Sequence, residues 1–454
     1  MLLRFGVENH DSIASYQELH MTTTSLKDRE RGLLFVDDVS ESASSRSKEL
    51  RVSPVAAIYG ANAAGKSTLL RAFDFFVRGI VKSHTRIASA KGTPHYPFLL
   101  DDKWRKKPSR YDVDVVIDNV RYHYGYSVDG KKVVSEWLYS FQLNSARQVR
   151  SILFLRETIG DQPSVIMEFG KSLKGENKQI SKLVRSNSLF LSVAAQNNHP
   201  QLTPLFEYFS DQVARRLSDS ESERAMHEQL LAYFGADDDR RQRALSFLKA
   251  ADVGISEIKF SKTSFVLGEK QSEFLRDMEQ LLNRHFPDEK NSEKLSLHDN
   301  DELVTASLQH LGANGKSYPI ELMKESAGTL SLLRLIGPAF VRLLSGGVLI
   351  VDELNSTLHP LVSRELIRLF SEPESNPGKA QLIFTTHDTN LLCNRLLRRD
   401  QIWFAEKDSV GATHVYPLSD IKVRATDDFE KGYLTGRFGA IPFIGRAPFD
   451  DLCE

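Results

Sequence analysis

The chain of 454 residues has few cysteines and no excess of charge of either sign. Its two cysteines, Cys393 and Cys453, provide neither a disulfide framework nor a paired-cysteine zinc knuckle or zinc hook, which fits a reducing cytoplasm. There are 59 lysines and arginines against 60 aspartates and glutamates, a net charge of -1, so no global field attracts nucleic acid or anionic lipid. A local basic face is compatible with this balance.

Long hydrophobic runs and sustained heptads are also missing. No uninterrupted apolar run reaches the roughly 18 residues of a membrane span, and the start MLLRFGVENH lacks a basic segment followed by an apolar one. Without sustained heptads, a long coiled-coil arm is not expected. We therefore expect a cytoplasmic protein without membrane contact, long enough for a head domain with a sizeable insertion.

One segment joins a buried strand, a glycine-rich loop and a helix. Residues 52–59 are apolar and β-branched, GANAAGKS follows, and the next residues have helical periodicity. This is the GxxxxGK[ST] phosphate loop in the context that its mechanism requires, which disfavours a chance glycine-rich turn. Lys66 is expected to bridge the β and γ phosphates and Ser67 to bind Mg²⁺. The predicted nucleotide-binding residues here are Gly60, Ala61, Asn62, Ala63, Ala64, Gly65, Lys66, Ser67 and Thr68.

Two carboxylates end a second predicted strand, at residues 348–351. Buried acids need a cationic partner, and Mg²⁺ would supply it. We therefore expect Asp352 to act on Mg²⁺ and Glu353 to be the general base for the attacking water. His387 follows a further apolar strand, where it is predicted to sense the γ-phosphate. A plain strand end with solvated acids, and a histidine that merely caps the chain, are the structural alternatives.

The rest of the chain divides by its pattern. Residues 111–143 alternate with period two, which predicts an antiparallel meander. Residues 203–250 are helical in pattern, and residues 261–302 are polar and poorly patterned, as in a connector. The serine-rich stretch 40–47 is typical of an exposed loop.

The order of these motifs resembles that of ABC ATPases of the SMC/RecF branch. ESAGT, at 325–329, precedes a predicted helix between the phosphate loop and the acids, and NSTLHP follows the acids. Within this branch the chain is most similar to the RloA/AbiL-type AAA-family ATPases of bacterial abortive-infection loci. The segments that carry this likeness are VENHDSI at 7–13, SLFLSVAAQNN at 188–198 and FEKGYLTGRFGAIPF at 429–443.

The resemblance implies an α/β fold: an ABC-type P-loop ATPase head with a mixed sheet, an antiparallel β lobe and an inserted helical region. Residues 1–200 would form the N-terminal half of the head, 201–315 the insertion and connector, and 316–454 the C-terminal half.

Further site residues follow from the same resemblance. Ser326 and Gly328 would belong to the signature motif that contacts the γ-phosphate bound to another copy, and a helix N-terminus is a suitable anion site there. A helix cap is the simpler interpretation of the same residues. Gln196 would be the Q-loop residue that reaches Mg²⁺ and water. Asn355 stands where related chains often have Asp. Asp11 stands where they usually have Lys or Arg. Because an acid repels bound phosphate, a contact between this N-terminal segment and the nucleotide is in doubt.

The expected function is an ATP-gated switch with ATP and Mg²⁺ as ligands, acting as a dimer or higher oligomer. By resemblance it would serve antiphage defence and control a separate effector encoded nearby, a nuclease or toxin, in response to a phage-derived trigger. Nucleic acid is a further candidate partner, and a DNA-repair or recombination ATPase that clamps DNA is the alternative. About 65 residues follow His387, too few for an appended nuclease module. Residues 429–443 are either an interaction surface or a docked tail.

Overall fold

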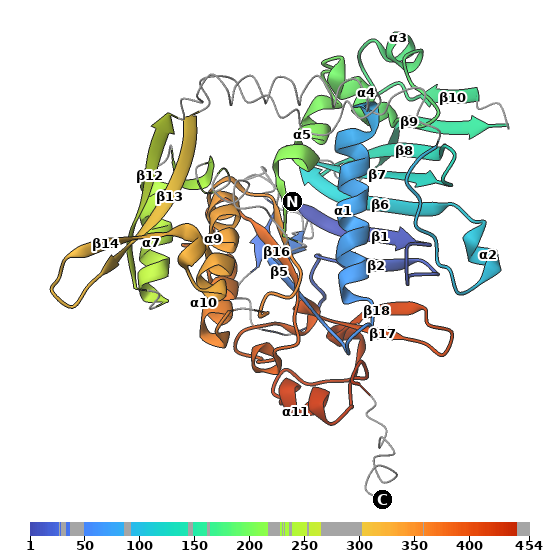
Figure 1. Cartoon of the computed structure of the whole chain (residues 1–454). Helices are drawn as coiled ribbons and strands as arrows, with labels where there is room; N and C mark the ends of the chain where they lie inside the picture. Colours follow the sequence, from blue (N-terminus) through green and yellow to red (C-terminus); the bar gives the residue numbers. More distant parts are fainter. Residues whose placement is uncertain are drawn as a thin grey trace, which may run out of the picture. The chain divides into compact units, whose positions relative to one another are not determined.

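A computed structural model of the chain (Figure 1) describes residues 1–26, 28, 33–36, 50–85, 92–143, 149–160, 164–216, 228, 230, 232–235, 238–251, 254–264, 302–356 and 358–442. Its contacts divide the chain into two compact units. The first is Met1–Asp219 with Val341–Glu454, and the second is Ser220–Phe340. The predicted loop at 40–47 lies outside the described residues, as does most of the predicted connector.

The first unit holds most of the described elements. Its strands are β1 (Leu2–Glu8), β2 (Gln17–His20), β3 (Leu34–Phe35), β4 (Arg51–Val52), β5 (Val55–Tyr59), β6 (Ser109–Ile117), β7 (Val120–Val128), β8 (Val133–Gln142), β9 (Arg150–Ile159), β10 (Ser164–Phe169), β11 (Val213–Arg216), β15 (Val348–Val351), β16 (Gln381–Thr385), β17 (Ile402–Lys407) and β18 (Thr413–Pro417). Its helices are α1 (Lys66–Lys82), α2 (Asp102–Arg105), α3 (Asn177–Ser181), α4 (Phe190–Gln196), α5 (Thr203–Asp211), α10 (Pro360–Ser371) and α11 (Phe429–Leu434).

A mixed six-stranded sheet carries the predicted phosphate loop. Its order is β11-β15-β16-β5-β17-β18, and all neighbours are parallel except β17 and β18. Strands β5, β15 and β16 are buried along their whole length, as their continuous apolar sequences require. The carboxyl ends of these three parallel strands therefore meet at one edge, which is where open α/β sheets bind ligands.

A second, antiparallel sheet has the order β10-β9-β8-β7-β6-β1-β2. The meander predicted at 111–143 is confirmed as β6, β7 and β8. Asp118 and Asn119 turn the chain between β6 and β7 with φ of 48° and 60°, the left-handed backbone that a two-residue hairpin needs. Strands β9 and β10 extend the meander on one side, and β1 and β2 extend it on the other.

Helix α1 packs on the inner face of the antiparallel sheet. The ring of Phe76 stacks on Tyr126, with centroids 5.4 Å apart, and Phe73 lies 4.7 Å from Phe5 of β1. Apolar residues of β5, β15 and β16 belong to the same buried core. The predicted mixed sheet and antiparallel lobe are thus confirmed as two layers that share one helix, which fixes the position of the loop between β5 and α1.

The second unit contains α7 (Asp238–Ala250), β12 (Ile255–Ser264), β13 (Glu302–Leu311), β14 (Ser317–Glu321) and most of α9 (Ala327–Ser345). The three strands form an antiparallel sheet in the order β12-β13-β14, although no strand was expected between the helical pattern at 203–250 and residue 315. A register shift after Ile255 interrupts the period-two pattern of β12, so the alternation is hard to recognise. Residues 203–216, expected to be helical and part of the insertion, form helix α5 and strand β11 of the first unit, because α5 packs on α1 and β11 pairs with β15. The helical prediction is therefore wrong for β11, whose partner in the sheet is distant in sequence.

Within the described part of the chain, α9 is the helix long and apolar enough to cross a membrane by length and composition. Of its most apolar window, 61% is buried inside the protein, as in a core helix.

The segment after β18 returns to the mixed sheet. Tyr433 of α11 stacks on Phe404 of β17 with ring centroids 5.6 Å apart, and it lies 6.0 Å from Tyr59. The ring of Phe438 lies 5.9 Å from Phe404, and its carbonyl accepts a hydrogen bond from the Tyr416 hydroxyl. Of the two alternatives left by the sequence, residues 429–442 therefore form a docked segment of the head.

Candidate nucleotide-binding site

The loop between β5 and α1 is tightly built. A Cβ at Gly60 would lie 2.3 Å from the carbonyl oxygen of Ala405, so no larger residue fits there. Gly65 has a φ of 100°, and a Cβ on it would lie 2.1 Å from the Thr413 hydroxyl. Ala63 also adopts a left-handed φ, 61°. Such a succession of turns directs backbone N–H groups inward, which is the anion cradle that a phosphate loop provides.

Lys66 begins α1 and curls back over the loop. Its ammonium donates hydrogen bonds to the carbonyls of Gly60 and Ala61, at 3.0 and 2.9 Å. Burial lowers the pKa of Lys66, while the nearby carboxylates of Asp352 and Glu353 raise it. The loop's own carbonyls and the two acids therefore hold the amine at the mouth of the cradle.

Strand β18 and the N-terminal segment brace the loop from outside. The buried Thr413 hydroxyl donates to the carbonyl of Ala64 at 3.0 Å. Ser12 bonds both to Thr413, at 2.8 Å, and to the Thr68 hydroxyl, at 3.1 Å. Thr413 was not predicted as a site residue, because the sequence of one strand does not show which segments lie beside it in the fold.

Two predicted metal ligands meet at the sheet edge. The Ser67 hydroxyl donates to Oδ1 of Asp352 at 3.0 Å, although 285 residues separate them. The Thr385 hydroxyl, at the end of β16 between β5 and β15, donates to the same oxygen at 2.6 Å. Hydroxyl and carboxylate oxygens are suitable ligands for Mg²⁺, so these residues fit the metal that the sequence predicts.

Glu353 occupies a strained position beside this pair. Its backbone has a φ of 51°, in the left-handed region that a non-glycine residue seldom adopts. Its N–H donates to the Thr385 hydroxyl at 2.7 Å, and this bond fixes the turn. The residue itself is exposed. Backbone strain of this kind concentrates at functional sites, which supports a chemical role for the carboxylate.

His387 lies in the electrostatic field of the same groups. Loss of solvation and then the positive charge of Lys66 lower the pKa of His387, against the opposing effect of Glu353 and Asp352. The Asn355 side-chain oxygen accepts hydrogen bonds from the Thr386 hydroxyl, at 2.7 Å, and from the His387 N–H, at 3.4 Å. The Asn355 side chain therefore links the segment that follows Asp352 and Glu353 to the segment that contains His387.

The predicted signature residues lie in the second unit. Ser326 is exposed and caps α9, because its hydroxyl accepts a hydrogen bond from the N–H of Thr329 at 3.1 Å. Gly328 is in the first turn of the helix. Glu325 is held by His310 at 2.7 Å. Ser326 is thus a helix cap at an exposed helix N-terminus. Its contact with the γ-phosphate bound to another copy stays a prediction.

The structure does not bring Gln196 to the phosphate loop. Helix α4, which ends at Gln196, is anchored at the far end of α1, where Ser192 contacts Ile80 and Ser83. Ile80 lies fourteen residues after Lys66, about 21 Å along a helix. Figure 1 shows α4 at the end of α1 opposite β18. The fold therefore gives no support to the predicted Q-loop role.

The acid at position 11 has a cationic neighbour. Nε of Arg71, one turn after Ser67 on α1, lies 3.8 Å from the Asp11 carboxylate. Arg71 therefore balances the negative charge that Asp11 places where related chains usually have Lys or Arg. An exposed ion pair at this distance stabilises the fold little.

The comparisons with known proteins give one family match. A family model described as "AAA domain, putative AbiEii toxin, Type IV TA system" matches residues 55–394. No curated protein matches the chain.

Three of the solved structures that are similar to the chain are SMC head domains. The SMC head domain from Thermotoga maritima is 10% identical, with a TM-score of 0.37, and the match covers 92% of this chain and 98% of that one. The SmcHead bound to the C-winged helix domain of ScpA is 13% identical, with a TM-score of 0.37 and coverage of 93% and 99%. An Smc head domain with an extended coiled coil, bound to a ScpA domain derived from Pyrococcus furiosus, is 13% identical, with a TM-score of 0.35 and coverage of 96% and 98%.

Proposed function

The chain belongs to this AAA domain family, and we propose that it binds and hydrolyses ATP with Mg²⁺ as an ABC-type ATPase head. The observation that carries the proposal is the bond between Ser67 and Asp352 at the mouth of a loop that also holds Lys66. These residues would bind Mg²⁺ and the β and γ phosphates respectively. Mg²⁺, when bound, supplies charge neutralisation at the phosphates.

The remaining groups suit the hydrolytic step. Water adds to the γ-phosphorus, the bond to the β–γ bridging oxygen breaks, and ADP leaves with that oxygen. Glu353 accepts the proton of the water, and the turn held by Thr385 fixes the backbone that carries its carboxylate. The N–H of a neutral His387 can donate a hydrogen bond to an oxygen of the γ-phosphate, and its lowered pKa favours the neutral form.

We propose further that the site is completed by a second copy of the chain. Ser326 and the α9 N-terminus are exposed, so they are accessible to another molecule, and helix N-termini attract phosphate. Two ATP molecules held between copies would favour a closed dimer that hydrolysis opens.

Mixing two defective variants tests this composite site. Lys66→Ala and Ser326→Arg subunits are each expected to be inactive alone. In a heterodimer, the intact loop of the Ser326→Arg subunit would face the intact signature of the Lys66→Ala subunit, and the other site would be doubly damaged. With random pairing about half of the dimers are mixed, so turnover should recover to roughly a quarter of wild type if the sites act independently.

The phosphate-release assay of the mixture is paired with mass measurement of the dimers. Ser246→Arg, which makes the same substitution at an exposed serine of α7 in the second unit, serves as the control and should retain most of the activity. Full activity of Ser326→Arg alone would exclude Ser326 from the site. If heterodimers form but the mixture hydrolyses ATP only at the background rate, the proposal of independent sites shared between two subunits would be contradicted.

Thr385→Val tests the positioning role of the hydroxyl that joins Asp352 and Glu353. We expect turnover to fall about 10- to 100-fold, as when a residue that orients a metal ligand is lost, with a smaller change in ATP affinity. Thr435→Val, which removes an exposed hydroxyl bonded only within its own segment, is the matched control. If Thr385→Val hydrolysed ATP at the wild-type rate and with the wild-type dependence on Mg²⁺, the Thr385 hydroxyl would have no positioning role.

The biological setting that we propose is antiphage defence, in which the ATPase acts as a sensor switch for a separate effector, a nuclease or toxin. The support is the family description, which names an AbiEii toxin of a Type IV toxin–antitoxin system, and the resemblance to RloA/AbiL-type ATPases. Within the described residues, no group of three or more His, Cys, Asp or Glu side chains could hold a metal for a nuclease. Nucleic-acid cleavage by the purified chain would contradict a separate effector. ATP-dependent, salt-sensitive clamping of duplex DNA would instead support the repair alternative.

A further inference from the structure

The outer face of the antiparallel sheet carries a regular row of aromatic rings. Trp137, Tyr139 and Phe141 alternate along β8 with side chains that are buried on the inner face. Alternate residues of a strand lie about 6.6 Å apart, so the rings follow one another at about that spacing. The three aromatic residues are only partly buried. They form a row on the face opposite to the one that packs on α1.

An arginine from another strand of the same sheet lies over each ring. Arg110 of β6 covers Trp137, Arg121 of β7 covers Phe141, and Arg150 of β9 covers Tyr139, each with its guanidinium carbon 5.0 Å from the ring centroid. These arginines are well exposed or half-exposed, with exposed side-chain fractions of 46% for Arg110 and 35% for Arg121. The row therefore presents planar cationic groups stacked on aromatic planes.

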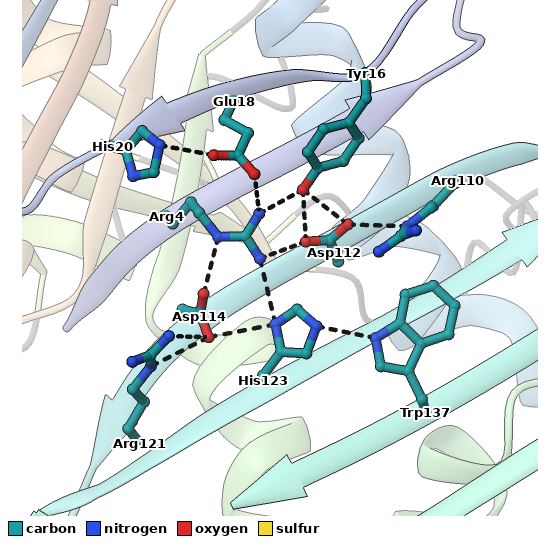
Figure 2. A network of polar contacts seen from close by, with 10 residues as sticks. All are labelled: Arg4, Tyr16, Glu18, His20, Arg110, Asp112, Asp114, Arg121, His123 and Trp137. Carbon is teal, nitrogen blue, oxygen red and sulfur yellow. Dashed lines mark hydrogen bonds and ion pairs between the residues drawn. The ribbon is translucent and has the colours of Figure 1, made fainter. Parts of the chain in front are cut away.

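A network of ion pairs lies on this same face (Figure 2). Arg4 lies at its centre and bonds Asp112, Asp114 and Glu18. Although burial raises the pKa of Asp114, the hydrogen bond from His123 and the charges of the neighbouring arginines hold it well below its usual value. Asp114 is therefore charged at neutral pH, and it is already engaged with protein cations.

The exposed arginines keep hydrogen-bonding capacity. Arg110 contacts Asp112 through Nε, and Arg121 contacts one oxygen of Asp114 through Nε and one terminal nitrogen. Among the described residues, no carboxylate pairs with Arg150. A guanidinium has five N–H donors, so most donors of these three arginines are available to a ligand. They surround a hollow of about 560 Å³ that the aromatic row also lines, together with Arg4, His123 and the ion-paired Asp114.

We propose that this face binds single-stranded nucleic acid. Bases stack on aromatic rings and on guanidinium planes, and exposed arginines donate to phosphates. A row of three such units along one strand suits successive unpaired bases, whereas the bases of a duplex are stacked on one another and are not free to use it. The overall charge of the chain is close to neutral, so the attraction is local to this face.

The test uses nucleotide-free full-length protein, so it does not depend on the ATPase proposal. Fluorescence anisotropy follows a labelled oligothymidylate, its oligouridylate counterpart and a duplex of the same length, each about 20 units and thus longer than a typical single-strand site. Tyr139→Ala should weaken binding of the single strands about 5- to 150-fold, the effect of losing one base stack. Arg150→Gln should weaken it and reduce its dependence on salt concentration.

Two exposed side chains elsewhere provide matched controls. Tyr318→Ala removes an exposed tyrosine of β14, and Arg368→Gln removes an exposed arginine of α10. Neither should change the affinity, and thermal unfolding should be similar for all four variants. Equal affinity of Tyr139→Ala and wild type would overturn the proposal, as would tighter binding of the duplex than of the single strands. A dimer lost on Tyr139→Ala without any nucleic-acid binding would show that the face is a subunit interface instead.

Discussion

Lys66→Ala is expected to lose ATP binding almost completely. The ammonium is the cation that the loop itself holds in place, through the Gly60 and Ala61 carbonyls, and alanine leaves the phosphates without it. We expect the affinity measured by calorimetry to fall on the order of a hundredfold or more, because truncating one partner of a desolvated charge pair has an effect of that size. Turnover should fall to background.

Lys82→Ala, at the opposite end of α1, is the matched control and should bind ATP normally. Thermal unfolding without nucleotide should be similar for both variants, since the loss concerns a ligand contact rather than the core. Unchanged ATP affinity of a folded Lys66→Ala protein would show that the loop between β5 and α1 does not hold the phosphates.

Glu353→Gln is expected to separate binding from hydrolysis. Glutamine keeps the size of the side chain and the backbone N–H that bonds Thr385, but it cannot accept the proton of the water. We expect a loss of turnover of about 10²- to 10⁴-fold, the usual contribution of a general base, with ATP affinity nearly unchanged. ATP-bound dimers should therefore accumulate, which size-exclusion chromatography with light scattering would detect.

Glu372→Gln, at the C-terminal end of α10 where Glu372 contacts Arg368, is the control and should turn over ATP like wild type. If Glu353→Gln hydrolysed ATP at the wild-type rate in single-turnover measurements, another group would have to be the base. The strained turn at Glu353 would then need a different explanation.

The elements that local sequence determines were predictable. The phosphate loop combines strand, glycines and helix within about thirty residues, and the two acids directly follow a continuous apolar strand. Lys66, Ser67 and Asp352 therefore lie in the expected elements, and the β6–β8 meander follows from its alternation and turns.

Contacts between distant strands could not be predicted in the same way. The roles of Thr385 and Thr413 depend on which strands are neighbours in the sheet, and the alternation of one strand does not identify its partner. Gln196 shows the opposite difficulty: its segment suggested a place in the site, but the anchoring of α4 by Ser192 and Ser83 places it at the far end of α1. A sequence pattern shows which face of a helix or strand is buried more reliably than it shows where that element lies in the fold.

The position of β5 in the mixed sheet has a consequence for biosynthesis. Both neighbours of β5, β16 and β17, are more than 320 residues later in the chain, and the Thr413 that braces the phosphate loop comes later still. While the ribosome is still translating the second unit, the nascent β5 has no partner on either edge, and unpaired apolar strands of this kind associate with one another. The phosphate loop thus emerges long before the strands that complete it, so nascent chains should depend on chaperones until synthesis passes β18.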